Sequence, residues 1–403
     1  MFDQLASVSP DPILQTLLAY RADHRKDKID LGVGIYRNEN GETPVFSSVK
    51  KAEALLLQRE DTKAYLGPLG STDFNQAISE LALGPYASRC QERLAVIQTP
   101  GGCGALRVGA ELIYRSQPQS RLWLSSPTWG NHRPLLGRVG FPLEEYRYLK
   151  QVEEKGVRIF LSSGLDFDGL KEDLQQASPK DVVLLHASCH NPSGEDLTRA
   201  QWTEVVELCQ RKDLIPFVDM AYQGFGQSLE EDIAGLVSLF SRCKTAVLAV
   251  SCSKNFGLYR ERTGALIVQS VNVDTARRVS EHLQQIVRGL YSMPPSHGAA
   301  VVTQILSDQR LRGEWVGELS ACRKRIQSTR SQFANGLRSQ CGERFDFLEK
   351  QNGMFSLLGL SVEQVRTLRK DFAVYLTEDS RLSLAGINTG NIDRLIGAIA
   401  SIV

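Results

Sequence analysis

"TAVLAVSCSKNFGLYRERTG", residues 245–264, joins a short apolar run to a segment of small polar residues that carries a single lysine. The apolar run at 245–251 is typical of a strand buried on both faces, and the polar residues after it are typical of a loop. Lys254 and Arg262 are therefore expected just beyond the carboxyl end of a buried strand. Two cations at the edge of a core point to chemistry rather than packing.

Similar apolar runs recur along the chain. They predict strands at residues 94–98, 121–126, 181–188, 214–219, 245–251 and 265–269. Amphipathic stretches such as "CGALRVGAELIYRS" and "RAQWTEVVELCQRKD" lie between the runs and have apolar residues at helical spacing. This alternation predicts an α/β fold, in which a mostly parallel central sheet is flanked by helices.

The pattern changes after about residue 300, where "EWVGELSACRKRIQSTRSQFANGLRSQ" predicts one long amphipathic helix. We expect an N-terminal arm and part of a small domain at 1–43, a large domain at 44–315 and a small C-terminal α+β domain at 316–403. The segment around the predicted turn at Asn40-Gly41 is expected to connect the two units.

The composition favours a protein that acts on small molecules. The 47 basic and 46 acidic residues nearly balance, which gives no indication of a nucleic acid or membrane partner. The N-terminus lacks the pattern of a signal peptide. The eight cysteines are scattered without a C-x-x-C pair, so we expect no metal site and no disulfide framework, and we predict a cytoplasmic location.

Polar and glycine-rich segments follow the predicted strands. They are "TPGGCG", "SSPTWGNH", "ASCHNPSG", "DMAYQGFG" and "SCSKNFG". Because the carboxyl ends of parallel strands meet at one edge of a sheet, these segments are expected to form one ligand site.

The lysine and the glycine-rich turn predict two parts of that site. A lysine amine that is partly desolvated can attack a carbonyl group, although a lysine here could also simply extend into water. The turn "TPGGCG" leads into a helix whose N-terminus favours an anion, and Ser251 and Arg262 could add donors. A tight turn without a ligand is the alternative, and the spacing does not match a nicotinamide or nucleotide site.

Four further side chains complete the prediction. Asp219 ends a buried strand and calls for a cationic partner such as a pyridinium nitrogen, although a turn or capping role is equally compatible. Asn191 and Tyr222 could donate to a phenolate oxygen, and Trp129 offers a flat face for stacking. A ligand with an aldehyde, a cationic ring nitrogen, a phenolate and a phosphate is required, and pyridoxal 5′-phosphate has all four.

An ordered set of motifs closely resembles the fold-type I aspartate and aromatic amino acid aminotransferases. The motifs run from "LGVGIYRNENGETPV" through "TPGGCGALR", "HNPSG", "DMAYQGFG", "SCSKNFGLYRERTG" and "QNGMFSLLGL" to "SRLSLAGIN". The resemblance implies that Lys254 binds the cofactor aldehyde and that Asp219 pairs with the ring nitrogen, supported by His132. It also implies further cofactor contacts from Gly102, Cys103, Trp129, Asn191, Tyr222, Ser251, Arg262 and Tyr65.

For the substrate, the resemblance implies that Arg381 binds the α-carboxylate near Gly34, Trp129 and Asn191. Arg288 corresponds to the arginine that reaches across a homodimer to a side-chain carboxylate, and Tyr65 also comes from the other subunit. Both arginine roles suit the planar guanidinium fork. A surface ion pair is the alternative for both arginines.

Several positions depart from the family pattern. Cys103 stands where threonine or serine is usual, and a thiol is a weak donor to a phosphate. Leu290, Met293 and Ala64 replace residues that are polar in dicarboxylate-specific members, which favours aromatic substrates. Thr43, by contrast, resembles the aspartate enzymes.

We therefore expect transfer of the amino group of aspartate, aromatic amino acids (tyrosine, phenylalanine) or both to 2-oxoglutarate by a ping-pong mechanism, in a homodimer with shared active sites. The expected ligands are amino acids and 2-oxo acids. Two alternatives remain: a pyridoxal-phosphate lyase or decarboxylase, and a catalytically idle binding protein of the same fold.

Overall fold

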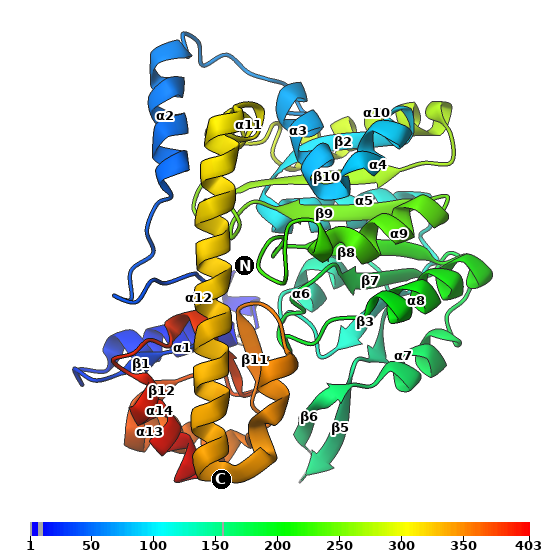
Figure 1. Ribbon diagram of the computed structural model, residues 1–403. Coiled ribbons are helices and arrows are strands. Elements are labelled where there is room, and N and C mark those ends of the chain that lie inside the picture. The colour runs from blue at the N-terminus through cyan, green and yellow to red at the C-terminus, as the bar shows by residue number, and fades with distance from the viewer. Residues whose placement is uncertain (1, 7–10, 155–156) are drawn as a thin grey trace.

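The computed structural model describes residues 2–6, 11–154 and 157–403. Its centre is a seven-stranded sheet with the order β2-β10-β9-β8-β7-β3-β4 (Figure 1). The strands are β2 (Leu94–Pro100), β3 (Leu122–Ser126), β4 (Leu143–Arg147), β7 (Val182–His186), β8 (Ile215–Met220), β9 (Ala246–Ser251) and β10 (Thr263–Gln269). All six strands predicted from apolar runs are present, and β4 was not predicted.

The sheet is mostly parallel, as predicted, with one reversed strand. β3, β4, β7, β8 and β9 pair in parallel, whereas β10 pairs antiparallel with both β9 and β2. The link between β9 and β10 is the loop 252–262, which contains Lys254 and no helix. A parallel crossover needs a longer connection that spans the sheet, so this short loop returns the chain in the opposite direction.

The two faces of the sheet bury separate hydrophobic cores. Leu122 and Leu124 contribute to one core and Trp123 to the other, as expected for side chains that alternate along a strand. The first core lies under α5 (Gly101–Ser116), α6 (His132–Gly137) and α10 (Val273–Leu290). The second lies under α7 (Phe167–Leu174), α8 (Arg199–Lys212), α9 (Ala234–Arg242) and the helices described next.

The predicted long helix is α12 (Gln309–Cys341), which follows α11 (His297–Ser307). Figure 1 shows α12 running the length of the molecule. One end packs against α2 (Ser47–Arg59) and α11, and the other packs against α14 (Ile392–Ala400) and η4 (Gly342–Lys350). A single rigid element therefore connects the sheet region with the C-terminal elements.

The N-terminal segment packs against the C-terminal elements. β1 (Ile29–Asp30) pairs in parallel with β12 (Val374–Tyr375), and β11 (Phe355–Leu357) pairs antiparallel with β13 (Arg381–Ser383). α1 (Pro12–Ala22) and α13 (Val362–Phe372) complete this region. The domain boundaries stay a prediction, and residues 1, 7–10 and 155–156 of the predicted domains lie outside the described residues.

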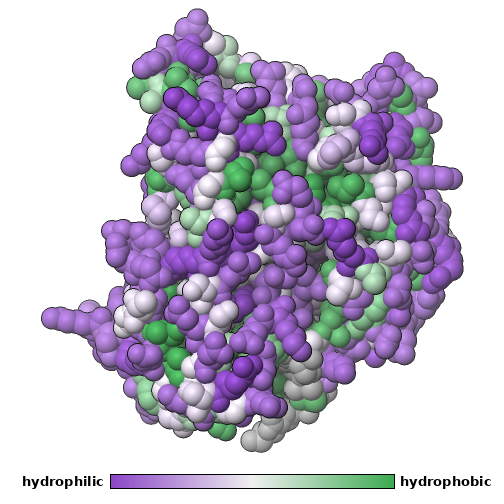
Figure 2. Space-filling model, viewed as in Figure 1, coloured by the Kyte–Doolittle hydropathy of each residue, from purple (hydrophilic) through white to green (hydrophobic). Residues whose placement is uncertain are grey.

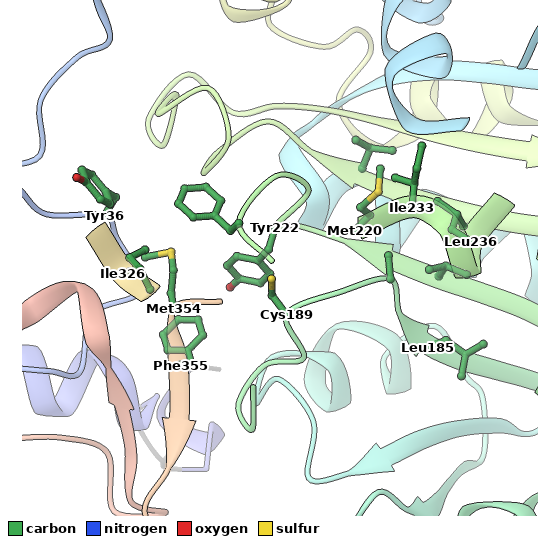
Figure 3. Packing of buried hydrophobic residues seen from close by; sticks show 14 of the residues in the cluster. Tyr36, Leu185, Cys189, Met220, Tyr222, Ile233, Leu236, Ile326, Met354 and Phe355 are labelled. Atoms are coloured by element: carbon green, nitrogen blue, oxygen red, sulfur yellow. The ribbon is translucent and has the colours of Figure 1, made fainter. Parts of the chain in front are cut away.

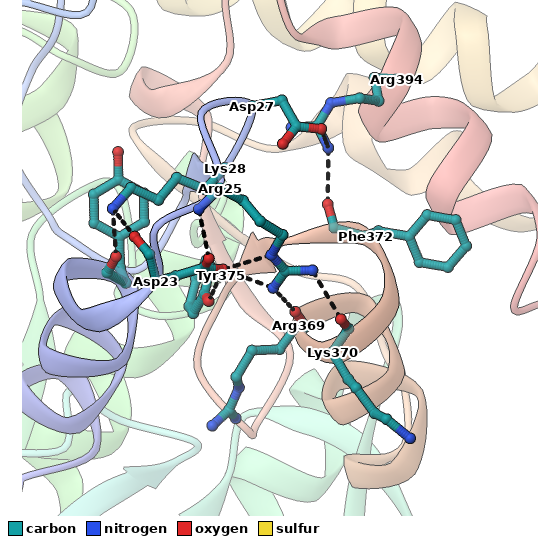
Figure 4. Close-up of polar contacts among 10 residues, drawn as sticks. Asp23, Arg25, Asp27, Lys28, Arg369, Lys370, Phe372, Tyr375 and Arg394 are labelled. Atoms are coloured by element: carbon teal, nitrogen blue, oxygen red, sulfur yellow. Dashed lines mark hydrogen bonds and ion pairs between the residues drawn. The ribbon is translucent and has the colours of Figure 1, made fainter.

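Polar contacts fasten the N-terminal segment to α13 and β12 (Figure 4). Arg25 donates from Nη1 to the carbonyl oxygen of Lys370 at 2.8 Å and from Nη2 to that of Arg369 at 2.9 Å. The Tyr375 hydroxyl donates to Asp23 at 2.5 Å. These contacts tie together two parts of the chain that are more than 300 residues apart in sequence.

The other elements lie around this framework. They are α3 (Thr72–Leu83), α4 (Pro85–Cys90), the β5–β6 hairpin (Leu149–Glu154 and Val157–Leu165) and the short helices η1 (Phe2–Gln4), η2 (Gln91–Arg93), η3 (Glu231–Ile233) and η5 (Leu384–Gly386). The predicted turn at Asn40-Gly41 is present: Gly41 N donates to Asn38 O at 2.9 Å, and Gly41 has φ 77°.

The face shown in Figure 2 is mainly hydrophilic, with hydrophobic residues in small patches. Within the described ranges, no helix combines the length and apolar character needed to cross a membrane.

Candidate active site

A cavity of about 270 Å³ lies at the carboxyl edge of the sheet. Side chains from the loops after β2, β3, β7, β8 and β9 meet there with residues from the N- and C-terminal segments. Eleven predicted site residues line it: Gly34, Gly102, Cys103, Trp129, Asn191, Asp219, Tyr222, Ser251, Lys254, Arg262 and Arg381. The structure therefore brings the segments predicted from separate strand ends into one site.

One end of the cavity is suited to an anion. α5 begins at Gly101 without a side-chain cap, so backbone N–H groups of its first turn remain available. A Cβ atom on Gly101 would lie 2.5 Å from Arg262 Nη2, and one on Gly102 would lie 3.1 Å from Ser251 Cβ. Gly101 also has φ 71°, which favours glycine. The two glycines thus allow the helix start to approach a guanidinium and a hydroxyl closely.

Asp219 stands at the carboxyl end of β8 and faces His132. Its Oδ2 lies 3.2 Å from His132 Nε2. Burial alone would raise the pKa of Asp219, but the hydrogen bond and charge of His132, together with His186 and Lys254, hold it below the ordinary value. A carboxylate that stays ionised in this position is suited to a protonated ring nitrogen.

His132 is itself held by groups that sequence reasoning missed. Thr128 Oγ1 lies 2.8 Å from His132 Nδ1 and 3.4 Å from His186 Nε2, and the two imidazole rings are 5.3 Å apart. Burial lowers the pKa of His186 to about 3, so this ring is neutral. His186 ends the apolar run of β7 beside Asp219 in the sheet register, which is the one signal that could have identified it.

Lys254 lies over the ring of Tyr222, with 4.9 Å between Nζ and the ring centroid. Burial lowers the pKa of Lys254, and the charges of Arg262 and Arg381 act in the same direction, although Asp219 and Cys103 oppose them. Burial likewise raises the pKa of Tyr222. The lysine is therefore biased towards its neutral, nucleophilic form and the phenol stays protonated.

Arg381, the first residue of β13, lines the cavity from the C-terminal elements and is only 4% exposed. Its Nη2 donates to Gly32 O at 2.7 Å and its Nη1 to Asn191 Oδ1 at 3.3 Å. Its Nε is buried and has no hydrogen-bond partner among the described residues. A buried guanidinium that is short of acceptors and faces a cavity is suited to a carboxylate ligand.

Sequence reasoning missed several apolar and small residues of the lining. Phe355 stacks near Arg381, with 4.6 Å between the guanidinium carbon and the ring centroid, and Figure 3 shows Phe355 beside Tyr222. Ile13, Leu106 and Ala221 also line the cavity. An apolar residue inside an apolar run gives no local signal that it faces a ligand.

Tyr65 and Arg288 lie outside the cavity of this chain. Tyr65 is 93% exposed. Arg288 is exposed at the end of α10, where its Nη1 donates to Ser292 Oγ. Cys103 does line the cavity, and burial raises the pKa of its thiol although Arg262 opposes this.

Residues 26–399 match the family described as aminotransferase class I and II. The chain belongs to this family. The aminotransferase is 42% identical to tyrosine aminotransferase of Rhizobium meliloti (strain 1021) and 42% identical to aspartate aminotransferase of Escherichia coli (strain K12), and each comparison covers 100% of both chains. The solved aromatic-amino-acid aminotransferase of Burkholderia pseudomallei, covalently bound to pyridoxal phosphate, superimposes with a TM-score of 0.93 at 37% identity, over 100% of this chain and 99% of that one.

The enzyme is a pyridoxal-phosphate-dependent aminotransferase of fold type I, and its cavity fits the cofactor. The uncapped start of α5, with Ser251 and Arg262, suits a phosphate. Asp219 suits a protonated ring nitrogen, and the Lys254 amine suits an aldehyde. Among the residues that the structure describes, no cluster of histidine, cysteine and acidic side chains could hold a metal ion.

Proposed function

We propose that the enzyme transfers the α-amino group of aspartate, of aromatic amino acids or of both to 2-oxoglutarate. The observation that carries this proposal is Arg381, a buried cation with an unpartnered Nε in the same cavity as Lys254 and Asp219. A substrate with a carboxylate next to the carbon that reacts could bind that carboxylate to Arg381 while the carbon lies near Lys254. The names of the relatives support these substrate classes.

The proposed residue roles follow from the geometry. Bound pyridoxal phosphate supplies an aldehyde that accepts the amino group and a ring that withdraws electrons from the substrate α-carbon. Lys254 Nζ takes the proton from that α-carbon and returns a proton during the transfer, for which a lowered pKa is appropriate. Asp219 holds the ring nitrogen in its protonated form, and His132 orients Asp219. Because one cavity serves donor and acceptor in turn, the kinetics are expected to be ping-pong.

Three further contacts hold the ring in place. Tyr222 and Asn191 donate to the ring oxygen; their side chains lie 3.5 Å apart, Nδ2 to Oη. Trp129 covers the ring face, and it packs edge-on against His132 with 5.2 Å between centroids. The phosphate would be held by Arg262, Ser251, Gly102 and Cys103. These contacts would fix the ring relative to Lys254, which lines the same cavity.

A second copy of the chain completes the site in this proposal. Tyr65 would reach the phosphate and Arg288 a substrate side-chain carboxylate in the partner subunit, which accounts for their exposure here. The neighbouring Leu66 and Leu290 are 48% and 45% exposed, as expected for side chains that a homodimer would cover. Leu290 beside Arg288 would also provide an apolar surface for an aromatic ring.

A spectroscopic titration tests the proposal. The purified enzyme is mixed with aspartate, phenylalanine and tyrosine in turn, without a keto acid, and the cofactor absorption is recorded. Conversion to the pyridoxamine form by an amino acid, reversed by 2-oxoglutarate, is the expected result. Steady release of keto acid or carbon dioxide without a second substrate would instead favour lyase or decarboxylase chemistry, and an unchanged spectrum with all three amino acids would contradict these substrate classes.

Hybrid dimers test the shared sites. A Lys254→Ala chain and an Arg288→Ala chain are each expected to be weak towards aspartate. In a mixed dimer, one site has Lys254 from one chain and Arg288 from the other, so aspartate activity should return. Hybrids that stay inactive would contradict the role of Arg288 in the partner's site.

We also propose a cytoplasmic location, which is supported by eight free cysteines.

A further inference from the structure

A second buried arginine lies close to the cavity but does not line it. Arg330 of α12 is 3% exposed, and no carboxylate forms an ion pair with it within the described part of the chain. Its Nη1 donates to Ser356 Oγ at 2.6 Å and more weakly to Leu348 O at 3.3 Å and Gln351 Oε1 at 3.5 Å. Its Nη2 donates to Gly353 O at 2.8 Å and Phe355 O at 3.2 Å.

All five acceptors belong to one short segment, residues 348–356, which runs from the end of η4 into the start of β11. Three of them are backbone carbonyl groups. A planar guanidinium fixes the directions of its donors, so it holds these carbonyl groups in one arrangement. Without it, the Gly353 carbonyl oxygen would lose the hydrogen bond that holds it, which a folded protein avoids. The Leu348 and Phe355 oxygens would keep only local donors, Gln351 N and Ser356 Oγ. The conformation of this segment therefore depends on Arg330.

The far side of the segment packs on the loop that carries Asn191. Asn352 N donates to Gly194 O at 2.8 Å, and Asn352 Nδ2 donates to Asp196 at 3.3 Å. Asp196 in turn accepts from the backbone N–H groups of Cys189 and His190 at 2.9 and 3.0 Å. A shift of the segment would therefore be passed to the backbone just before Asn191.

The segment includes Phe355, whose ring faces the cavity. The ring lies 4.6 Å from the Arg381 guanidinium and packs edge-on against Tyr222 at 6.0 Å (Figure 3). A Cβ atom on Gly34 would lie 2.8 Å from the ring, so the ring has little room to move. The ring itself has no polar group, and its position is set by packing and by the backbone that Arg330 holds.

We infer that Arg330 is a positioning residue for the carboxylate-binding end of the cavity, acting through the 348–356 segment on Phe355 and Asn191 and through them on Arg381. The inference rests on the proposed role of Arg381 as the carboxylate-binding group. The phosphate end of the cavity is built from other elements, the start of α5 and the loop after β9. Loss of Arg330 should therefore weaken carboxylate binding much more than cofactor binding, to which this segment contributes only through Asn191.

The test measures two affinities in the same protein. The holoenzyme is titrated with 3-phenylpropionate, a carboxylate that has an aromatic ring but no amino or keto group, and cofactor absorption reports binding. The apoenzyme is titrated separately with pyridoxal phosphate. Arg330→Met should raise the Kd for phenylpropionate about 10-fold and change the Kd for the cofactor less than about 2-fold. Arg330→Lys, which keeps the charge but not the fork, should fall between Arg330→Met and the wild type.

Arg338→Met is the matched control. Arg338 lies on the same helix and also contacts the following segment, but at the surface, through ion pairs with Asp346 and Glu349. This variant should keep both affinities, since exposed ion pairs contribute little. If Arg338→Met weakened phenylpropionate as much as Arg330→Met does, general packing of α12 would explain the effect and the inference would be wrong.

A double-mutant cycle with Phe355→Leu supplies the decisive outcome. If Arg330 acts through Phe355, the double variant Arg330→Met/Phe355→Leu should bind phenylpropionate no more than about 2-fold more weakly than Phe355→Leu alone. Multiplication of the two single effects, or an equal loss of cofactor affinity in Arg330→Met, would overturn the inference. Should Arg330→Met not fold, Arg330→Lys and Ser356→Ala replace it in the same cycle. A wild-type enzyme that fails to bind phenylpropionate would instead overturn the proposed carboxylate site of Arg381 itself.

Discussion

Arg381 and Arg330 are buried to nearly the same degree, 4% and 3% exposed, yet their surroundings differ. Arg381 has two neutral acceptors and an unpartnered Nε, and it faces a cavity. Arg330 has five acceptors from one segment and no cavity. Since a buried charge without partners is costly, the deficit at Arg381 marks a place for an anionic ligand. The full set of acceptors at Arg330 marks a structural role.

The two arginines do not differ in charge, although Arg381 belongs to the cavity and Arg330 to the segment that supports it. Burial lowers the pKa of Arg330 to about 10, against the charges of Cys189, Glu195 and Asp196, and it also lowers the pKa of Arg381. Since a guanidinium is not deprotonated in proteins, both groups are charged at neutral pH. What distinguishes a binding group from a positioning group here is the number of acceptors that the fold itself supplies.

Lys254 gives the largest expected effect, because it is the proposed proton-transfer group of the cavity. Lys254→Ala should slow the conversion of the cofactor by aspartate by up to about 10⁴-fold, as expected when a general acid–base group is removed. Stopped-flow absorbance with one amino acid measures this directly. The control is Lys244→Ala, an exposed lysine before β9, which should behave as the wild type. A Lys254→Ala enzyme with near-normal conversion would contradict the assignment of this cavity as the active site.

Arg381 gives the next largest effect and tests whether its unpartnered guanidinium group binds the substrate carboxylate. Arg381→Leu should raise the KM for every amino acid substrate about 100-fold, since charged hydrogen bonds to a carboxylate contribute about 1.5–3 kcal/mol each. Arg381→Lys should be intermediate. Steady-state kinetics with aspartate and phenylalanine provide the measurement. An unchanged KM would mean that the acceptor deficit at Arg381 is not used by the substrate.

His186 tests whether a buried neutral imidazole beside the cavity lowers the free energy of unfolding at low pH. The pKa of His186 in the folded enzyme is about 3, below the ordinary value of 6.5. Between these two pH values the unfolded chain binds a proton at His186 and the folded chain does not. The contribution to stability is complete above pH 6.5 and declines as pH falls towards 3. At pH 5 the loss is roughly 2 kcal/mol at about 1.4 kcal/mol per pH unit.

The measurement is urea denaturation at pH 7 and pH 5. His186→Gln should lose less stability on acidification than the wild type. His24→Gln, which alters an exposed histidine, should lose as much as the wild type. Equal pH dependence of wild type and His186→Gln would show that His186 is protonated in the folded enzyme.

Cys103 gives the smallest effect and concerns the phosphate end. A serine hydroxyl is a better donor than a thiol, so Cys103→Ser should tighten pyridoxal phosphate binding about 5-fold, roughly one neutral hydrogen bond. Fluorescence titration of the apoenzyme measures this. Cys341→Ser, at the far end of α12, is the control and should leave the affinity unchanged. Weaker cofactor binding in Cys103→Ser would mean that the thiol matters for packing and that its weakness as a donor does not limit the affinity.

Much of the fold could be predicted because its strands are buried on both faces and so appear as continuous apolar runs. The reversal of β10 could not be read from its apolar run, which looks the same in either direction. The β5–β6 hairpin and the short strands β1, β11, β12 and β13 were also not predicted, since they are short or lack a continuous apolar pattern. Their pairing depends on partners that are distant in sequence, such as Ile29 with Val374.

Most of the candidate site could be predicted because polar residues after strand ends stand out against apolar runs. Thr128 and Phe355 could not, because their role depends on what lies opposite them, and His186 gave one signal only, its place at the end of the apolar run of β7. Arg330 also looked like any other basic residue of an amphipathic helix.

By itself, the sequence determined which residue types follow each buried strand, and thus that an amine, a carboxylate and a guanidinium would meet at one sheet edge. Local pattern suffices for this because strand ends of a parallel sheet converge whatever the details of packing. Only the tertiary structure decided which buried cations lack acceptors, since a hydrogen-bond partner is a property of the assembled fold. That difference separates Arg381, which faces a cavity, from Arg330, which is enclosed by backbone carbonyl groups.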